Sequence, residues 1–249
     1  IIMGLKVPGI RIDREQFLRK EFQTKCTPEV IERAVESTPL RAGVPQEVVD
    51  GIADEVIKYE RACVSGISAA LGMPGGVAMA ATIPADIAQY YGYLLRATQK
   101  LMYLYGFPQI DVEERGQTFD SETMNLLILC MGVMYGVAGA GNALRSVAKA
   151  LSIGVEKQLL RRALTKGTIY PIVKSVSKWF GVKMTKEVFA GFFKKSIPVV
   201  GGVLGGGITF LTFKPCCDKL KESLRKTILS DPNYRDEENG VMAAEYTEL

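Results

Sequence analysis

The sequence predicts an all-α protein, a multi-helix bundle around Gly-rich apolar central helices. Apolar residues recur at intervals of three and four residues, as on one face of a helix, and no segment alternates apolar and polar residues as a strand does. Three runs are almost free of charge and rich in small residues: 62–86, 124–144 and 196–213. The 249 residues, 47% of them hydrophobic, are enough to bury a sizeable core.

The first three helices are predicted from their start signals and apolar stripes. Residues 13–23 place Phe17, Leu18 and Phe22 on one side of a short helix. Thr27, Pro28 and Glu29 combine a hydroxyl N-cap, a proline in the first turn and an acid, which predicts a helix to about Ser37. A long helix follows from near Pro45 to about Leu71. Its stripe is Val48, Val49, Ile52, Ala53, Val56 and Ile57.

The later helices are predicted mainly from prolines and glycines. Pro84 is expected to open a helix that ends after Tyr105, and Asp120 or Ser121 to cap the next one. Gly167, Pro171 and Gly181 should divide the following region into short amphipathic helices, and Pro215 should start the last helix. Residues 1–229 form a single helical domain on this interpretation, and 230–249 form an acidic, flexible C-terminal tail.

The three uncharged runs permit more than one interpretation. Each approaches the roughly 20 apolar residues that a membrane-spanning helix needs. However, if 124–144 and 196–213 both spanned, the basic loop between them would belong in the cytoplasm, and the first 123 residues would have to be exported without a signal. Helices buried in a bundle are therefore favoured, with a membrane-inserting effector as an alternative. Small residues such as Gly132 and Gly136 let helices pack closely, within the chain or in a homo-oligomer.

Charge is distributed unevenly along the chain. Residues 1–144 carry 13 Lys and Arg against 17 acids, residues 145–195 carry 12 against 2, and residues 196–249 carry 6 against 8, so the net charges are −4, +10 and −2. Basic residues mixed with aromatic ones are typical of an element at a membrane interface. A solvated helical face and a nucleic-acid site, which is less favoured, are the alternatives. The predicted anionic-partner surface is Arg161, Arg162, Lys174, Lys178, Trp179, Phe180, Lys194 and Lys195.

The sequence predicts no catalytic, cofactor or metal site. It contains no histidine, which excludes Ser-His-Asp catalysis and His-bearing zinc sites. Its five scattered cysteines indicate a reducing compartment rather than a disulfide framework. A carboxylate-based metal-dependent hydrolase using Asp50, Asp54 or Asp86 is the enzyme alternative. Asp86 is instead expected to be structural, because it would lie in the first turn after Pro84, where a carboxylate complements the helix dipole.

Three segments, in their order and spacing, resemble the bacterial EcsC protein family over about residues 10–229. They are 12–18, then 83–87 followed by 104–107, and 195–202. The resemblance implies a helical, Gly-rich, often membrane-associated protein encoded near an ABC transporter in some bacteria, and it brings no catalytic residues. The expected function is thus that of a non-enzymatic accessory protein, cytoplasmic and peripheral to the inner face of a bacterial membrane. Its expected partner is an anionic membrane surface or a membrane protein complex.

Overall fold

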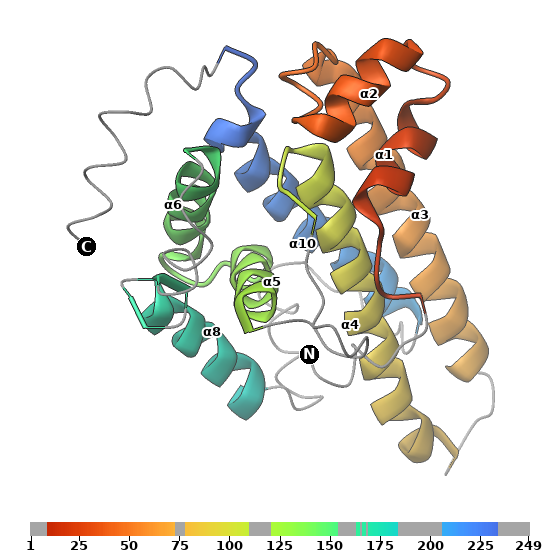
Figure 1. Ribbon diagram of the computed structural model, residues 1–249. Helices are drawn as coiled ribbons and strands as arrows, with labels where there is room; N and C mark the ends of the chain where they lie inside the picture. The colour runs from red at the N-terminus through yellow and green to blue at the C-terminus, as the bar shows by residue number, and fades with distance from the viewer. Residues whose placement is uncertain are drawn as a thin grey trace.

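A computed structural model describes residues 9–72, 78–109, 121–153, 163–164, 166–167, 169–183 and 206–233. Within these ranges the side chains of 67–72, 78–88, 121–122, 179–183 and 206–209 are not described. The described residues form eight α-helices and no strand, which confirms the all-α prediction (Figure 1). The helices are α1 (Arg14–Phe22), α2 (Pro28–Glu36), α3 (Gln46–Gly72), α4 (Ala78–Leu104), α5 (Ser121–Met134), α6 (Ala140–Ser152), α8 (Tyr170–Lys183) and α10 (Gly206–Arg225), followed by the short 3-10 helix η2 (Ile228–Ser230).

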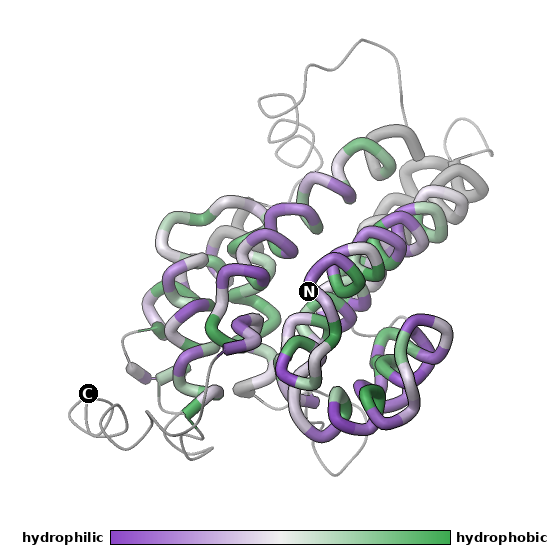
Figure 2. The backbone as a smooth tube through the Cα atoms, turned by 90° about the horizontal axis from the view of Figure 1, so that it is seen from above, coloured by the Kyte–Doolittle hydropathy of each residue, from purple (hydrophilic) through white to green (hydrophobic). Residues whose placement is uncertain are grey.

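The helices α3, α4 and α10 pack together along most of their lengths (Figures 1 and 2). The predicted stripe of α3 is the side that becomes buried, because Val49, Ile52, Ala53, Val56 and Ile57 are all in the core. The helix α10 runs antiparallel to α3: Arg225 pairs with Asp50, near the start of α3, and Phe210 lies under Arg61, farther along it. The helices α1, α5 and α6 each contact at least one of these three helices.

The apolar helix α5 packs against α6, α8 and α10, and its residues from Leu126 to Met134 are nearly all buried. Gly132 is what allows α8 to approach. A Cβ atom at Gly132 would lie 2.7 Å from Val176 Cγ2 and 3.2 Å from Ala140 Cβ, so no larger residue fits without displacing α8. Close packing through a small residue was expected here, and it occurs within the chain.

Three proline or glycine boundaries were predicted wrongly. The helix α4 begins at Ala78, so Pro84 lies inside it, and Pro215 lies inside α10. A proline within a helix removes one backbone hydrogen bond at a cost of about 3 kcal/mol, and packing can outweigh that cost. At Pro215 the carbonyl left without its donor belongs to Leu211, a residue that is 44% exposed. Gly181 likewise lies within α8 and does not end it.

The uncharged run 124–144 is not one helix. It breaks at the turn between Met134 and Ala140, where Gly136 and Gly139 have φ angles of +69° and +83°. Such angles suit glycine and strain other residues, which is why the break falls there. No helix within the described ranges is both long and apolar enough to cross a bilayer. Of the predicted tail, only 230–233 fall in the part of the chain that the structure describes.

The segment 9–13 before α1 is held against the bundle by hydrogen bonds from polar side chains. Gln99 on α4 donates to the Ile10 carbonyl (2.8 Å) and accepts from the Ile12 backbone N–H (3.2 Å). Its amide therefore pairs with this extended segment as a neighbouring strand would. Tyr103 OH donates to the Ile12 carbonyl at 3.2 Å. The start of the described chain is thus held against α4.

Candidate functional site

The helix α8 carries an exposed row of one aromatic and two basic side chains. Tyr170, Lys174 and Lys178 recur every four residues, so they share one face of the helix, and all three are exposed. The opposite face is buried through Val173 and Val176. We call Tyr170, Lys174 and Lys178 the α8 surface.

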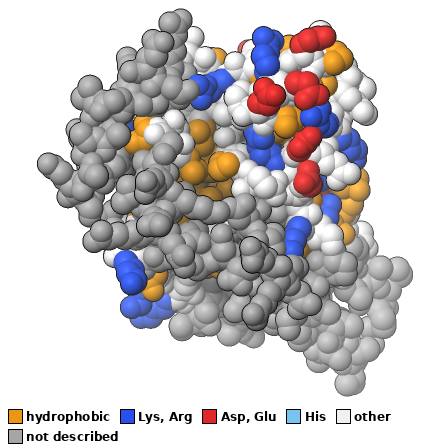
Figure 3. Space-filling model, in the orientation of Figure 1, with side chains coloured by type: hydrophobic (Ala, Val, Ile, Leu, Met, Phe, Trp, Pro, Cys, Tyr) orange, Lys and Arg blue, Asp and Glu red, His pale blue; other side chains and the backbone are white. Residues whose placement is uncertain are grey.

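The two lysines of the α8 surface have no carboxylate within ion-pair distance among the described residues. In Figure 3 the red acidic side chains gather at the upper right, where Figure 1 places α1 to α3, and the lower left near α8 shows blue without red. Many cations elsewhere are neutralised within the protein. Examples are Arg19 with Glu15, Lys25 with Glu55, Lys221 with Asp54, Arg225 with Asp50 and Lys226 with Glu222.

Only part of the predicted anionic-partner surface can be located. Lys174 and Lys178 come together on α8 as expected. Trp179 and Phe180 continue the same helix, but their side chains are not described. Arg161, Arg162, Lys194 and Lys195 lie outside the described residues. Sequence reasoning overlooked Tyr170, although its place four residues before Lys174 was a signal that could have identified it.

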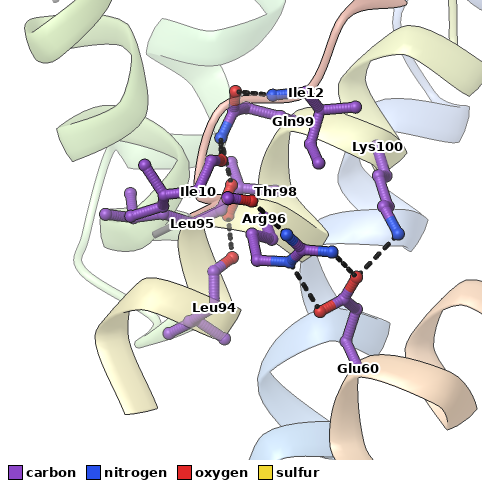
Figure 4. A network of polar contacts seen from close by, with 10 residues as sticks. Ile10, Ile12, Glu60, Leu94, Leu95, Arg96, Thr98, Gln99 and Lys100 are labelled. Atoms are coloured by element: carbon purple, nitrogen blue, oxygen red, sulfur yellow. Dashed lines mark hydrogen bonds and ion pairs between the residues drawn. The ribbon is translucent and has the colours of Figure 1, made fainter. Parts of the chain in front are cut away.

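A network of polar side chains is centred on Glu60, which is fully buried on α3 (Figure 4). Its carboxylate accepts from Lys100 Nζ at 2.7 Å and from Arg96 Nε at 3.2 Å, both on α4. Arg96 also donates to the Gly9 carbonyl. The network therefore joins α3, α4 and the segment before α1.

The Glu60 network has the features of a structural junction. Lys100 Nζ lies 5.5 Å from the centre of the Tyr59 ring and 5.7 Å from that of Phe17, and its side chain is only 12% exposed. Both carboxylate oxygens already accept hydrogen bonds from the two cations. Glu60 is fully buried and paired with two cations, which fits a structural role.

Two of the three carboxylates of the enzyme alternative, Asp50 and Asp54, are also occupied. Asp50 accepts from Tyr105 OH (2.7 Å) and pairs with Arg225 (3.1 Å), and burial next to Asp50 raises the pKa of Tyr105. Asp54 pairs with Lys221 at 2.7 Å. Asp86 is the ninth residue of α4, beyond its first turn, so the reason given for a structural role there is wrong. Within the described ranges, no three acids or cysteines are grouped so that they could hold a metal ion.

All five cysteines are free thiols, and three of them are buried. Burial raises the pKa of Cys130 and that of Cys216 to about 12, from an ordinary value of 9.0. A nucleophilic cysteine needs the opposite shift, because the thiolate is the reactive form. Cys130 and Cys216 are accordingly core residues, and neither is an activated nucleophile.

These thiols predict a loss of stability in alkali. A group whose pKa is raised by folding contributes stability that is fully present below its unfolded pKa, near 9, and is lost as the pH rises towards 12. The thermal unfolding temperature should therefore fall between pH 9 and pH 12. Cys130→Ala should make that fall shallower, while its difference from wild type at pH 7 measures the packing cost alone. If the unfolding temperatures of the two proteins depended on pH in the same way, Cys130 would not contribute to the loss of stability in alkali.

Comparisons of this chain with protein-family models, with curated proteins and with solved structures each found no match. The resemblance to the EcsC family therefore stays a prediction.

Proposed function

We propose that this protein is a non-enzymatic accessory protein that binds peripherally to anionic membrane, at the inner face of a bacterial membrane, through its basic segment. The single observation that carries the proposal is the α8 surface: two exposed lysines without an acidic partner among the described residues, in line with an exposed tyrosine. Lysines near an anionic bilayer contribute about 1 kcal/mol each, and tyrosine favours the headgroup region.

The local charge favours an anionic partner over mere solvation. The described cations of α6 and α8 belong to a stretch, residues 145–183, that has Glu156 as its one acid. Elsewhere in the described chain, basic side chains form ion pairs with nearby acids, as Arg19 does with Glu15, Lys25 with Glu55 and Lys221 with Asp54. A surface that lacks the counter-charges found on the rest of the molecule attracts anions over a distance of about 8 Å at physiological salt.

Changing Lys174 and Lys178 together to Gln should weaken binding to anionic vesicles about 30-fold. Two lysines at about 1 kcal/mol each give about 2 kcal/mol, and each 1.4 kcal/mol is a factor of ten. The measurement is co-sedimentation with vesicles of phosphatidylcholine, with and without phosphatidylglycerol, over a range of salt concentrations. Wild-type binding should require the anionic lipid and fall as salt rises.

The matched control is Lys20→Gln with Lys58→Gln, two exposed lysines on α1 and α3 that lower the net charge by the same amount. This variant should bind nearly as wild type does. Equal losses in both variants would mean that net charge acts without a defined surface. Tighter binding to duplex DNA than to vesicles at the same salt concentration would indicate that the α8 surface binds nucleic acid, and it would contradict the membrane proposal.

A further inference from the structure

Three helices have an uncharged terminal segment towards the same end of the bundle. The helix α3 ends at Gly72 and its antiparallel neighbour α4 begins at Ala78. The helix α10, antiparallel to α3, begins at Gly206 towards the same end, since its Phe210 contacts Arg61 in the second half of α3. In Figure 2 the coloured part of α10 changes from green to purple along the helix. We call residues 62–72, 78–85 and 206–213 the uncharged end, because none of them is charged.

The described side chains at this end include an exposed apolar pair. Phe210 and Leu211 are each 44% exposed, and both are large, adjacent and on α10. The guanidinium of Arg61 lies 4.0 Å from the centre of the Phe210 ring. The ion pairs of α10 are all formed at or beyond Lys214 in the described chain. The helix is thus divided into an apolar beginning and a charged remainder.

Two unsatisfied polar atoms lie on the part of α3 that carries Arg61. Arg61 Nε and Ser65 Oγ, one turn apart on α3, are both buried and have no hydrogen-bond partner among the described residues. A buried donor without an acceptor costs about as much as a lost hydrogen bond, so the Arg61 side chain gains if it turns towards an acceptor at the surface. A phosphate oxygen is an acceptor that a guanidinium binds strongly.

We infer that the uncharged end is a second membrane contact, in which Phe210 and Leu211 enter the bilayer interface and the Arg61 side chain turns outward to bind a lipid phosphate. This inference rests on the proposed function, because it adds an apolar contact to the same binding event. Apolar side chains flanked by an arginine are the composition of an element that lies in the headgroup region. The α8 surface supplies salt-sensitive attraction, and the uncharged end supplies the part of the binding that salt does not remove.

The first experiment locates the contact by fluorescence. Leu211→Trp is made in a Trp179→Phe background, which leaves a single tryptophan, and mixed with anionic vesicles whose acyl chains carry bromine. The fluorescence should be quenched several-fold. Gln23→Trp in the same background is the control, because this exposed residue lies near α1 at the charged end, and it should not be quenched.

The second experiment separates this inference from the proposed function. Phe210→Ser with Leu211→Ser should leave low-salt binding largely intact and remove the fraction that stays bound at high salt, whereas Lys174→Gln with Lys178→Gln should do the reverse. Arg61→Gln should also reduce the high-salt fraction. Circular dichroism checks that each variant is folded. An unquenched Leu211→Trp, or an unchanged high-salt fraction in the Ser variant, overturns the second contact and leaves the α8 surface standing. Failure of the wild-type protein to bind anionic vesicles overturns both.

Discussion

Arg14→Ala is expected to destabilise the protein by about 3–5 kcal/mol, although Arg14 is far from the α8 surface. The Arg14 side chain is buried and donates to four backbone carbonyls: Phe107 (3.1 Å), Val35 (2.6 Å), Ala34 (3.2 Å) and Ser37 (2.7 Å). Three of these acceptors are at the C-terminal end of α2, where carbonyls have no partner within the helix and the helix dipole favours a cation. Removing the guanidinium leaves buried acceptors unsatisfied, at about 1–3 kcal/mol each before water enters.

The measurement is the free energy of unfolding in urea. Arg33→Ala is the matched control, because Arg33 is an exposed arginine on α2 and should change stability by about 0.5 kcal/mol or less. Arg14→Lys should recover only part of the loss, since a single ammonium cannot reach four carbonyls in the planar arrangement of a guanidinium. A stability of Arg14→Ala within 1 kcal/mol of wild type would contradict this role.

Arg14 illustrates what the sequence could and could not predict. The start of α1 was predictable, because the Asp13 side chain accepts from the Gln16 N–H at 2.7 Å as an N-cap. The apolar side of α1 was predictable too. The burial of Arg14 was not, because its acceptors lie 20 to 93 residues away along the chain and belong to α2 and to the segment after α4. Local patterns predict helices, but they do not show which ends of those helices meet.

The prolines show a second limit. Pro84 and Pro215 were interpreted as helix starts, which is the commonest position for a proline, yet both lie within helices. Whether a helix continues through a proline depends on the packing of the residues before it, and this is a tertiary property. Thr212 and Phe213, three and two residues before Pro215, are buried against the bundle, and Phe213 stacks edge-on with Tyr90 at 6.0 Å.

For a similar reason, the sequence could predict the positions of the lysines of the α8 surface but not their surroundings. The excess of basic residues between 145 and 195 can be counted in the sequence, and the spacing of Lys174 and Lys178 places them on one face. That no described carboxylate lies near them depends on where the acids of the other helices lie in the folded protein. The acids of α3, for instance, pair with α10 through Asp50 and Asp54 and are not available to α8.

Glu60→Gln is expected to cost about 3–5 kcal/mol of unfolding free energy. The Glu60 side chain is 0% exposed and neutralises two cations whose own side chains are largely buried, Arg96 (21% exposed) and Lys100 (12% exposed). A buried ion pair is often close to neutral for stability as a whole, because desolvation offsets the attraction. Removing one partner is different, since it leaves the opposite charge buried and unpaired.

A sequence signal for this residue exists, because Glu60 follows Val56 by four residues and Ile57 by three and therefore continues the buried stripe of α3. The matched control is Glu55→Gln, the same substitution on the same helix at an exposed glutamate paired with Lys25 at 3.0 Å. It should cost about 1 kcal/mol or less, because exposed ion pairs contribute little. Lys100→Met added to Glu60→Gln should restore part of the stability by removing one of the two unpaired charges. If Glu60→Gln and Glu55→Gln unfold at the same urea concentration, Glu60 is not the junction of α3, α4 and the segment before α1.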